Sequence, residues 1–106
     1  MQTLENDILI VQVSEHGAEL QSIRKDGTEY LWQGDPAYWG RRSPVLFPIV
    51  GSVWEKRYRV AGVEYEMGQH GFARDMDFTL VEGNETEVRF RLESNAETLA
   101  KYPYPF

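Results

Sequence analysis

The chain has 106 residues, of which 42% are hydrophobic and 26% are charged, with a formal net charge of −6. This length fits one domain with a modest core, and the composition is that of an ordered, water-soluble protein rather than a disordered one. The acidic balance without any run of Lys or Arg excludes a basic nucleic-acid-binding surface, and the absence of cysteine excludes disulfides, thiolate metal sites and cysteine nucleophiles.

The first residues, MQTLENDILIVQV, have neither the basic start nor the small-residue cleavage site of a signal peptide. No apolar stretch of the sequence approaches the length of a membrane span. These features predict a cytoplasmic protein without a membrane partner.

Three strands and a tight turn are predicted in the first third of the chain. Residues 7–13, DILIVQV, are mostly apolar and too short for a convincing helix, which predicts a strand covered on both faces. Residues 18–24 form a second extended segment. Asp26-Gly27 is a strong two-residue turn signal, after which residues 29–32, EYLW, are expected to return as the partner strand.

The middle of the chain is predicted to be irregular. Residues 34–40, GDPAYWG, mix Gly, Pro and aromatic residues without a period, as loops do. In residues 41–51, RRSPVLFPIVG, Pro44 and Pro48 bracket an apolar run, and both lack the N–H group that a helix or a central strand requires. We expect a buried, irregular segment that crosses the fold.

Two hairpins and a short helix are predicted in the second half. Residues 56–67 alternate apolar and charged side chains around a turn at 61–62, and residues 76–94 repeat the pattern around a turn at 83–84, with one face in water. Residues 94–103, SNAETLAKYP, combine a Ser or Asn cap with a proline stop. Many short strands with one helical turn indicate an all-β fold, an antiparallel sandwich or barrel.

His70, in the stretch MGQHGFARD, is the strongest candidate for a functional residue. Gln69 and Arg74 flank it with hydrogen-bonding groups, Gly71 allows a close backbone approach, and an imidazole exchanges protons near neutral pH. The alternative is a structural histidine bonded to a loop carbonyl, with Arg74 and Asp75 as a local ion pair.

Arg41 and Arg42 enter the proline-bracketed segment, where a guanidinium could present a fork of donors to hydroxyl groups or to a carboxylate. A solvated loop arginine is the alternative for at least one of them. Four further aromatic residues could stack on sugar faces, with core packing as the alternative for most of them: Trp32, Tyr38, Trp39 and Trp54.

The only two histidines, His16 and His70, lie far apart in sequence, and His16 is expected to be an exposed turn residue. No His-x-x-x-His pair, acidic cluster or Gly-rich phosphate loop is present. The sequence therefore predicts neither a metal site nor a phosphate-binding cofactor.

Two motifs, YWGRRSPVLFPIVG and, further along, GQHGFARDMDF, resemble those of the aldose 1-epimerase (galactose mutarotase-like) family, in particular its LacX-like branch. The resemblance implies that residues 1–106 form a single, incomplete domain, the N-terminal part of the antiparallel β-sandwich called the galactose mutarotase-like supersandwich. It also implies a small-molecule sugar, an aldohexose, bound in an open cleft on one sheet, and no metal or organic cofactor.

The reaction implied by this resemblance is the interconversion of α and β anomers. A general base takes the proton of the anomeric hydroxyl while a general acid protonates the ring oxygen, so that the sugar ring opens and closes again. By resemblance, His70 binds the substrate, Arg41 contacts the sugar and Arg74 supports the cleft. The family's general acid histidine and general base glutamate fall beyond position 106, so no catalytic residue is expected in this chain.

We therefore expect an aldose 1-epimerase-like isomerase portion that is inactive alone. One alternative is a non-catalytic carbohydrate-binding module that keeps the aromatic residues and His70. The other is a β-sandwich interaction domain that self-associates through exposed sheet edges.

Overall fold

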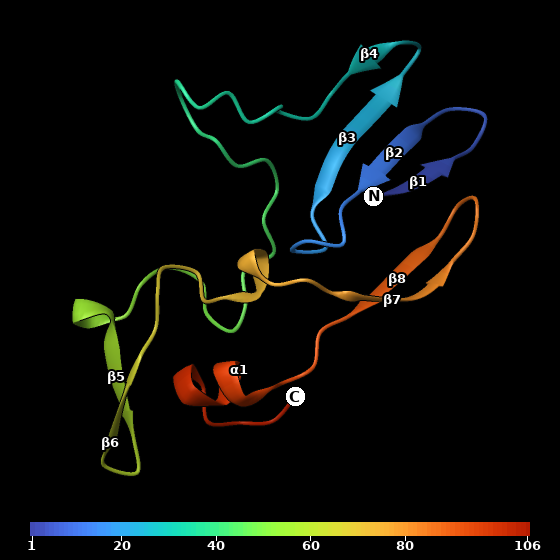
Figure 1. Cartoon of the computed structure of the whole chain (residues 1–106). Coiled ribbons are helices and arrows are strands. Elements are labelled where there is room, and N and C mark those ends of the chain that lie inside the picture. The colour runs from blue at the N-terminus through green and yellow to red at the C-terminus, as the bar shows by residue number, and fades with distance from the viewer.

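The computed structural model of the chain describes all 106 residues, which form three antiparallel sheets, one short α-helix and two single-turn 3₁₀ helices, Trp54–Lys56 and Ala73–Asp75 (Figure 1). The first sheet has the order β1-β2-β3-β4, and the hairpins β5–β6 and β7–β8 form the other two. The strands are β1 (Gln2–Glu5), β2 (Ile10–Val13), β3 (Leu20–Lys25), β4 (Thr28–Glu29), β5 (Arg57–Val60), β6 (Val63–Glu66), β7 (Thr79–Gly83) and β8 (Val88–Arg91), and the helix is α1 (Ala96–Lys101).

The β1–β4 sheet carries an apolar row across its first three strands, where Leu4, Val11 and Ile23 lie in register and are half-buried. Between β3 and β4, Asp26 and Gly27 both have positive φ, 51° and 77°, as a tight two-residue hairpin turn requires. The predicted turn is thus confirmed, because its signal lies entirely within two residues.

The predicted strand 7–13 is wrong in its bounds and in its burial. Asn6 accepts hydrogen bonds from the Ile8 and Leu9 N–H groups at 2.9 and 2.8 Å, which makes a turn and separates β1, which was not predicted, from β2. Ile8 and Ile10 are 62% and 40% exposed, so the segment is not covered on both faces. The partner strand expected at 29–32 ends already at Glu29.

Glu29 ends β4 with a carboxylate that is held by three hydrogen bonds. It accepts from the Ser22 hydroxyl, from the Ile23 N–H at 2.8 Å and from the Leu31 N–H at 3.0 Å. These bonds, the Ser22 bond foremost, lower the pKa of Glu29 from 4.5 to about 2. The Leu31 N–H thus bonds to a side chain and not to strand β3, which is consistent with the early end of the strand.

A carboxylate with a lowered pKa stabilises the fold above its unfolded-state pKa and loses that contribution as it is protonated. For Glu29 the contribution is complete above pH 4.5 and disappears as the pH falls toward about 2. We expect the Glu29 carboxyl carbon to titrate in NMR near pH 2, and nearer its ordinary value in Ser22→Ala. A midpoint that Ser22→Ala leaves unmoved would contradict this assignment.

The segment 41–51 is irregular, as predicted, with a single isolated bridge between Phe47 and Gly71. It is not buried throughout, because Val45 and Leu46 are exposed and Val50 is 76% exposed. Phe47 packs this segment against other parts of the chain. The centroid of its ring lies 6.3 Å from that of Phe72 and 5.0 Å from that of Phe106.

Both predicted hairpins of the second half are present. Residues 61–62 form the tight turn between β5 and β6, but residues 84–87 form a longer loop between β7 and β8. Asn84 causes the difference, because its side-chain oxygen accepts from the Thr86 and Glu87 N–H groups, each at 2.9 Å. β7 is exposed along its whole length, so the expectation that this hairpin shows only one face to water is wrong for that strand.

The predicted helix is confirmed as α1, which begins after Asn95. The Asn95 side chain accepts from the Thr98 N–H and the Thr98 hydroxyl accepts from the Asn95 N–H, which completes a capping box. The Tyr58 hydroxyl donates to the Lys101 carbonyl, which joins β5 to the helix, and desolvation there raises the pKa of Tyr58. None of the helices has the length and apolar character that a membrane-spanning helix needs.

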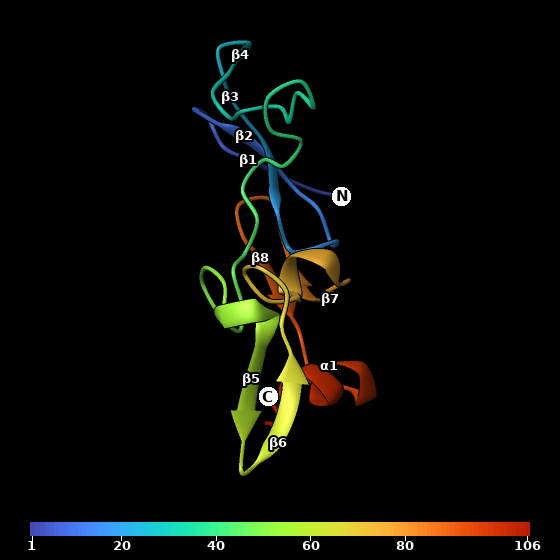
Figure 2. The same cartoon turned by 90° about the vertical axis from the view of Figure 1, so that its left-hand side faces the viewer.

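The three sheets lie along a thin, elongated body that is 55 × 34 × 15 Å (Figure 2). Its radius of gyration is 16.5 Å, whereas about 13 Å is usual for a globular domain of this length. Its accessible surface is 7397 Å², against about 6,100 Å² expected for a globular protein of this mass. The sheets therefore do not close over one another within this chain.

Candidate functional site

The bend 68–71 places His70 at the junction of the two sequence motifs. The Gly71 N–H donates to the Gly68 carbonyl at 3.1 Å, and His70 has a left-handed backbone with a φ of 61°. Such a conformation is uncommon for a residue with a side chain and gathers at functional sites. Two backbone hydrogen bonds, from Gly71 to Gly68 and from His70 to Gly51, hold this left-handed conformation in place.

Gly51 fixes the orientation and the tautomer of the His70 ring. The backbone N–H of His70 donates to the Gly51 carbonyl, and the backbone N–H of Gly51 donates to the ring nitrogen Nδ1 of His70, each at 2.7 Å. Because a backbone amide can only donate, Nδ1 is the acceptor and the neutral ring carries its hydrogen on Nε2. Nε2–H is therefore the group that His70 can offer to a ligand.

Gly71 brings the backbone of the first motif against that of the second. The Phe72 and Ala73 N–H groups both donate to the Phe47 carbonyl, at 3.0 and 3.2 Å. A Cβ atom at Gly71 would lie 2.2 Å from the Phe47 oxygen, so no larger residue fits without displacing the segment. The segments RRSPVLFPIVG and GQHGFARD thus form one wall.

A cavity of about 450 Å³ lies on this wall, within the volume range of small-molecule sites. Its lining residues are Trp39, Ser43, Pro44, Leu46, Gln69, His70 and Arg74. They combine an aromatic ring with several hydrogen-bonding groups, and no carboxylate is among them.

Arg74 brings donors to this cavity. Its Nη2 donates to the Gln69 carbonyl at 3.1 Å, whereas its Nε is buried without a hydrogen-bond partner. An unpaired buried donor is costly unless a ligand or water completes it. The local ion pair between Arg74 and Asp75, considered as an alternative, is not formed.

Arg41 does not line the cavity. Its Nη2 lies 3.0 Å from Asp75 Oδ1 in an ion pair, beside the wall rather than in the cavity. Arg42 has a structural role instead, because its Nη1 donates to the Gln21 carbonyl at 2.6 Å and to Gln33 Oε1 at 3.0 Å. A sugar contact of Arg41 stays a prediction.

His16 lies outside the cavity, and its predicted exposure is confirmed, although it forms an isolated bridge with Asp77 rather than part of a turn. Its ring is 59% exposed, with Nδ1 2.7 Å from Asp77 Oδ1. Of the four aromatic residues considered for stacking, Trp39 alone lines the cavity. The Trp32 indole donates to the Trp39 carbonyl at 2.8 Å and so supports the loop from behind, whereas Trp54 is 86% exposed elsewhere.

Sequence reasoning missed two contributors to the wall. Ser43 lines the cavity, and its hydroxyl donates to the Leu20 carbonyl at 2.9 Å. Gly51 sets the tautomer of His70 through its backbone N–H, so the residue type at position 51 does not indicate this role.

Comparison with known proteins places the whole chain in one family. The model of the family described as aldose 1-epimerase matches residues 1–106. The protein LacX (chromosomal) of Lactococcus lactis subsp. lactis is 46% identical over 110 residues, which cover 97% of this chain and 36% of that protein. The chain therefore spans about a third of the length of the curated relatives that it matches.

Two solved structures have nearly the same backbone. A galactose mutarotase related enzyme from Lactobacillus acidophilus is 42% identical, with a TM-score of 0.96 over 98% of this chain and 35% of that one. A galactose mutarotase-like protein from Lactobacillus casei is 43% identical, with a TM-score of 0.95 over 99% of this chain and 36% of that one. The predicted fold, an N-terminal part of the galactose mutarotase-like antiparallel sandwich, is confirmed.

Proposed function

The chain belongs to the aldose 1-epimerase family, and on that premise we propose that it supplies one wall of an aldohexose-binding site in a mutarotase-type isomerase. The observation that carries the proposal is the Gly51–His70 hydrogen bond, which leaves Nε2–H as the donor for a sugar oxygen. The cavity beside it adds Trp39 as an apolar surface for a sugar face and Arg74 as a second donor.

Anomer interconversion needs a base at the anomeric hydroxyl and an acid at the ring oxygen. His70 Nδ1 is occupied by Gly51, and the cavity has no carboxylate lining, so this chain offers no base there. We assign His70 and Arg74 to binding and orienting the sugar, with the acid and base supplied by the larger protein. The isolated chain then binds sugar without accelerating its anomerisation.

A non-catalytic carbohydrate-binding module is the second candidate, and the same lack of a carboxylate in the cavity favours it. The two functions differ in what happens when the rest of the sandwich is supplied. An isomerase portion acquires activity, whereas a binding module does not.

Sugar binding is testable by NMR on the 106-residue chain with labelled histidine. D-galactose or D-glucose at roughly millimolar levels, typical of a shallow site with few contacts, should shift the His70 Nε2 signal. His70→Ala should weaken binding about tenfold, which is the loss of one hydrogen bond. Because this variant lacks the labelled His70 ring, its affinity and that of the wild type are compared by tryptophan fluorescence, since Trp39 lines the cavity.

His16→Ala is the matched control, because His16 is the other histidine and lies outside the cavity. It should leave the affinity unchanged. Equal affinities of the wild type and His70→Ala, or no shift at His70 with either sugar, would refute the assigned wall.

A further inference from the structure

Ser43 has a fixed hydrogen-bonding role in the cavity beside His70. Its hydroxyl lies 2.9 Å from the Leu20 carbonyl oxygen. Because a carbonyl can only accept, the hydroxyl donates its one hydrogen to Leu20. The lone pairs of the Ser43 oxygen remain for the cavity, which Ser43 lines. Ser43 therefore presents an acceptor to a ligand and has no hydrogen left to donate.

The other polar side chains that line this cavity are mostly donors. The Trp39 indole and the Arg74 guanidinium have no acceptor atom. His70 offers Nε2–H, because Gly51 occupies Nδ1. Gln69 carries a second neutral acceptor, but its amide can present either its oxygen or its NH₂ group. Ser43 is thus the acceptor whose role the structure fixes.

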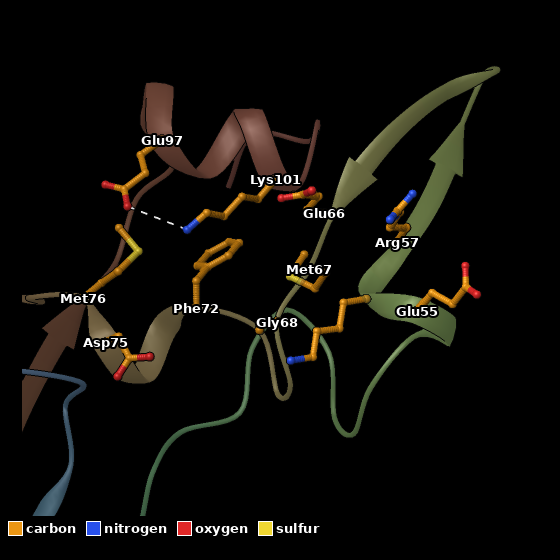
Figure 3. A pocket seen from close by; sticks show the side chains of 12 residues that line it. Glu55, Arg57, Glu66, Met67, Gly68, Phe72, Asp75, Met76, Glu97 and Lys101 are labelled. Carbon is orange, nitrogen blue, oxygen red and sulfur yellow. Dashed lines mark ion pairs between the residues drawn. The ribbon is translucent and has the colours of Figure 1, made fainter.

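Carboxylate acceptors lie in a neighbouring cavity instead. That cavity, of about 560 Å³, adjoins the bend 68–71 through Gly68 and Gly71. Four acidic residues line it (Figure 3), namely Glu55, Glu66, Asp75 and Glu97. The His70 cavity has a neutral acceptor of fixed orientation in their place, which suits the hydroxyl group of an uncharged sugar.

The residues at the start of β3 hold Ser43 in this orientation. One oxygen of the half-buried Glu19 carboxylate accepts from the Arg42 N–H at 3.1 Å and from the Ser43 N–H at 2.9 Å. Hydrogen bonds from N–H groups to a charged carboxylate are about twice as strong as those between neutral groups. Glu19 therefore fixes the backbone of Ser43, and the Leu20 carbonyl next to it fixes the hydroxyl.

We propose that Ser43 is a specificity-determining residue that accepts a hydrogen bond from one hydroxyl of the bound aldohexose, with Glu19 as its positioning residue. This inference rests on the proposed function, since it takes the sugar to occupy the cavity beside His70. One sugar hydroxyl has to donate to Ser43, whereas sugar oxygens that face His70 and Arg74 accept. Fluorine has no hydrogen, so it cannot replace the hydroxyl that donates.

The test measures the binding of sugar analogues to the 106-residue chain by tryptophan fluorescence, since Trp39 lines the cavity. The parent sugar is D-galactose or D-glucose, whichever binds more tightly. Each hydroxyl other than the anomeric one is replaced in turn by hydrogen and by fluorine. At one position both analogues should bind roughly tenfold more weakly than the parent, which is the loss of one hydrogen bond.

Ser43→Ala removes the acceptor, so the parent sugar and both analogues at that position should then bind within twofold of one another. Glu19→Ala should shrink the tenfold loss to less than threefold, whereas Glu19→Gln keeps an oxygen for the two N–H groups and should preserve it. Gln69→Ala removes the other acceptor and should also preserve the loss. Glu64→Ala, at an exposed position outside the cavity, is the matched control for Glu19→Ala. The amide spectrum of each free variant shows whether it folds like the wild type.

The outcomes separate this inference from the proposed function. A wild-type chain that binds the parent sugar, but shows no position at which both analogues lose affinity, would overturn the role of Ser43 without any variant. A loss that Ser43→Ala preserves or that Gln69→Ala removes would do the same. The wild-type pattern of losses in Glu19→Ala would exclude Glu19 as the positioning residue. No binding of either parent sugar would refute the proposed function and this inference with it.

Discussion

Replacing Gly71 with alanine should destabilise the chain by roughly 2–4 kcal/mol, from a strained left-handed backbone and an overpacked contact together. Gly71 has a φ of 74°, and a Cβ atom there would lie 2.2 Å from the Phe47 oxygen and 2.6 Å from Pro48 Cδ. Both neighbours belong to the segment that carries Gly51, so the His70 ring should also lose its fixed orientation. Urea denaturation followed by circular dichroism measures the loss of stability.

Gly62→Ala is the matched control, because Gly62 also has a positive φ, 80°, but nothing lies within 4 Å of the added Cβ atom. It should cost about 1 kcal/mol, the backbone strain alone. Equal losses in the two variants would show that the contact between the two motifs is not tight.

Removing the His70 imidazole should produce the largest loss of activity. The protein for this test is a chimera in which residues 1–106 replace the matching third of the Lactobacillus acidophilus relative. If His70 Nε2–H holds a sugar oxygen during anomerisation, His70→Ala should lower kcat/KM roughly 10²-fold, as the loss of a preorganised donor does. NMR exchange between α- and β-galactose gives the rates.

Two comparisons show whether the loss comes from the Nε2 donor. His70→Gln can keep a side-chain N–H and should recover part of the rate, whereas His16→Ala should match the unsubstituted chimera. A His70→Ala chimera that retains full kcat/KM would exclude any contact of His70 with the reacting sugar.

Local turn chemistry explains which parts of the fold could be predicted. Asp26-Gly27 and the cap at Asn95 act within a few residues, and their elements appear as expected. The turn at Asn6 and the greater length of the loop at Asn84 were missed for a related reason. Each depends on hydrogen bonds from nearby backbone N–H groups to an asparagine side chain, and the alternation of apolar and polar residues does not indicate such bonds.

Burial was the least predictable property, because it depends on which surfaces meet. Ile8, Ile10 and Val50 have the composition of a core but are exposed, since no second layer lies on them within this chain. An apolar pattern indicates which face of an element is suited to burial, but it does not show whether another layer packs on that face.

The candidate site, too, could be predicted only in part. The motif around His70 could be singled out from sequence, because a histidine beside a glycine and an arginine is a recognisable pattern. The partners that define the site come from distant positions: Gly51 holds the His70 ring, and Asp75 pairs with Arg41. Neither pairing follows from local spacing.

We propose that this chain carries the sugar-binding wall of an aldose 1-epimerase but neither its acid nor its base. Polarimetry of freshly dissolved α-galactose with the 106-residue chain, its chimera and buffer tests it most directly. The isolated chain should leave the buffer rate unchanged, and the chimera should accelerate mutarotation. Acceleration by the isolated chain would contradict it, and so would a chimera that stays inactive while the intact relative is active.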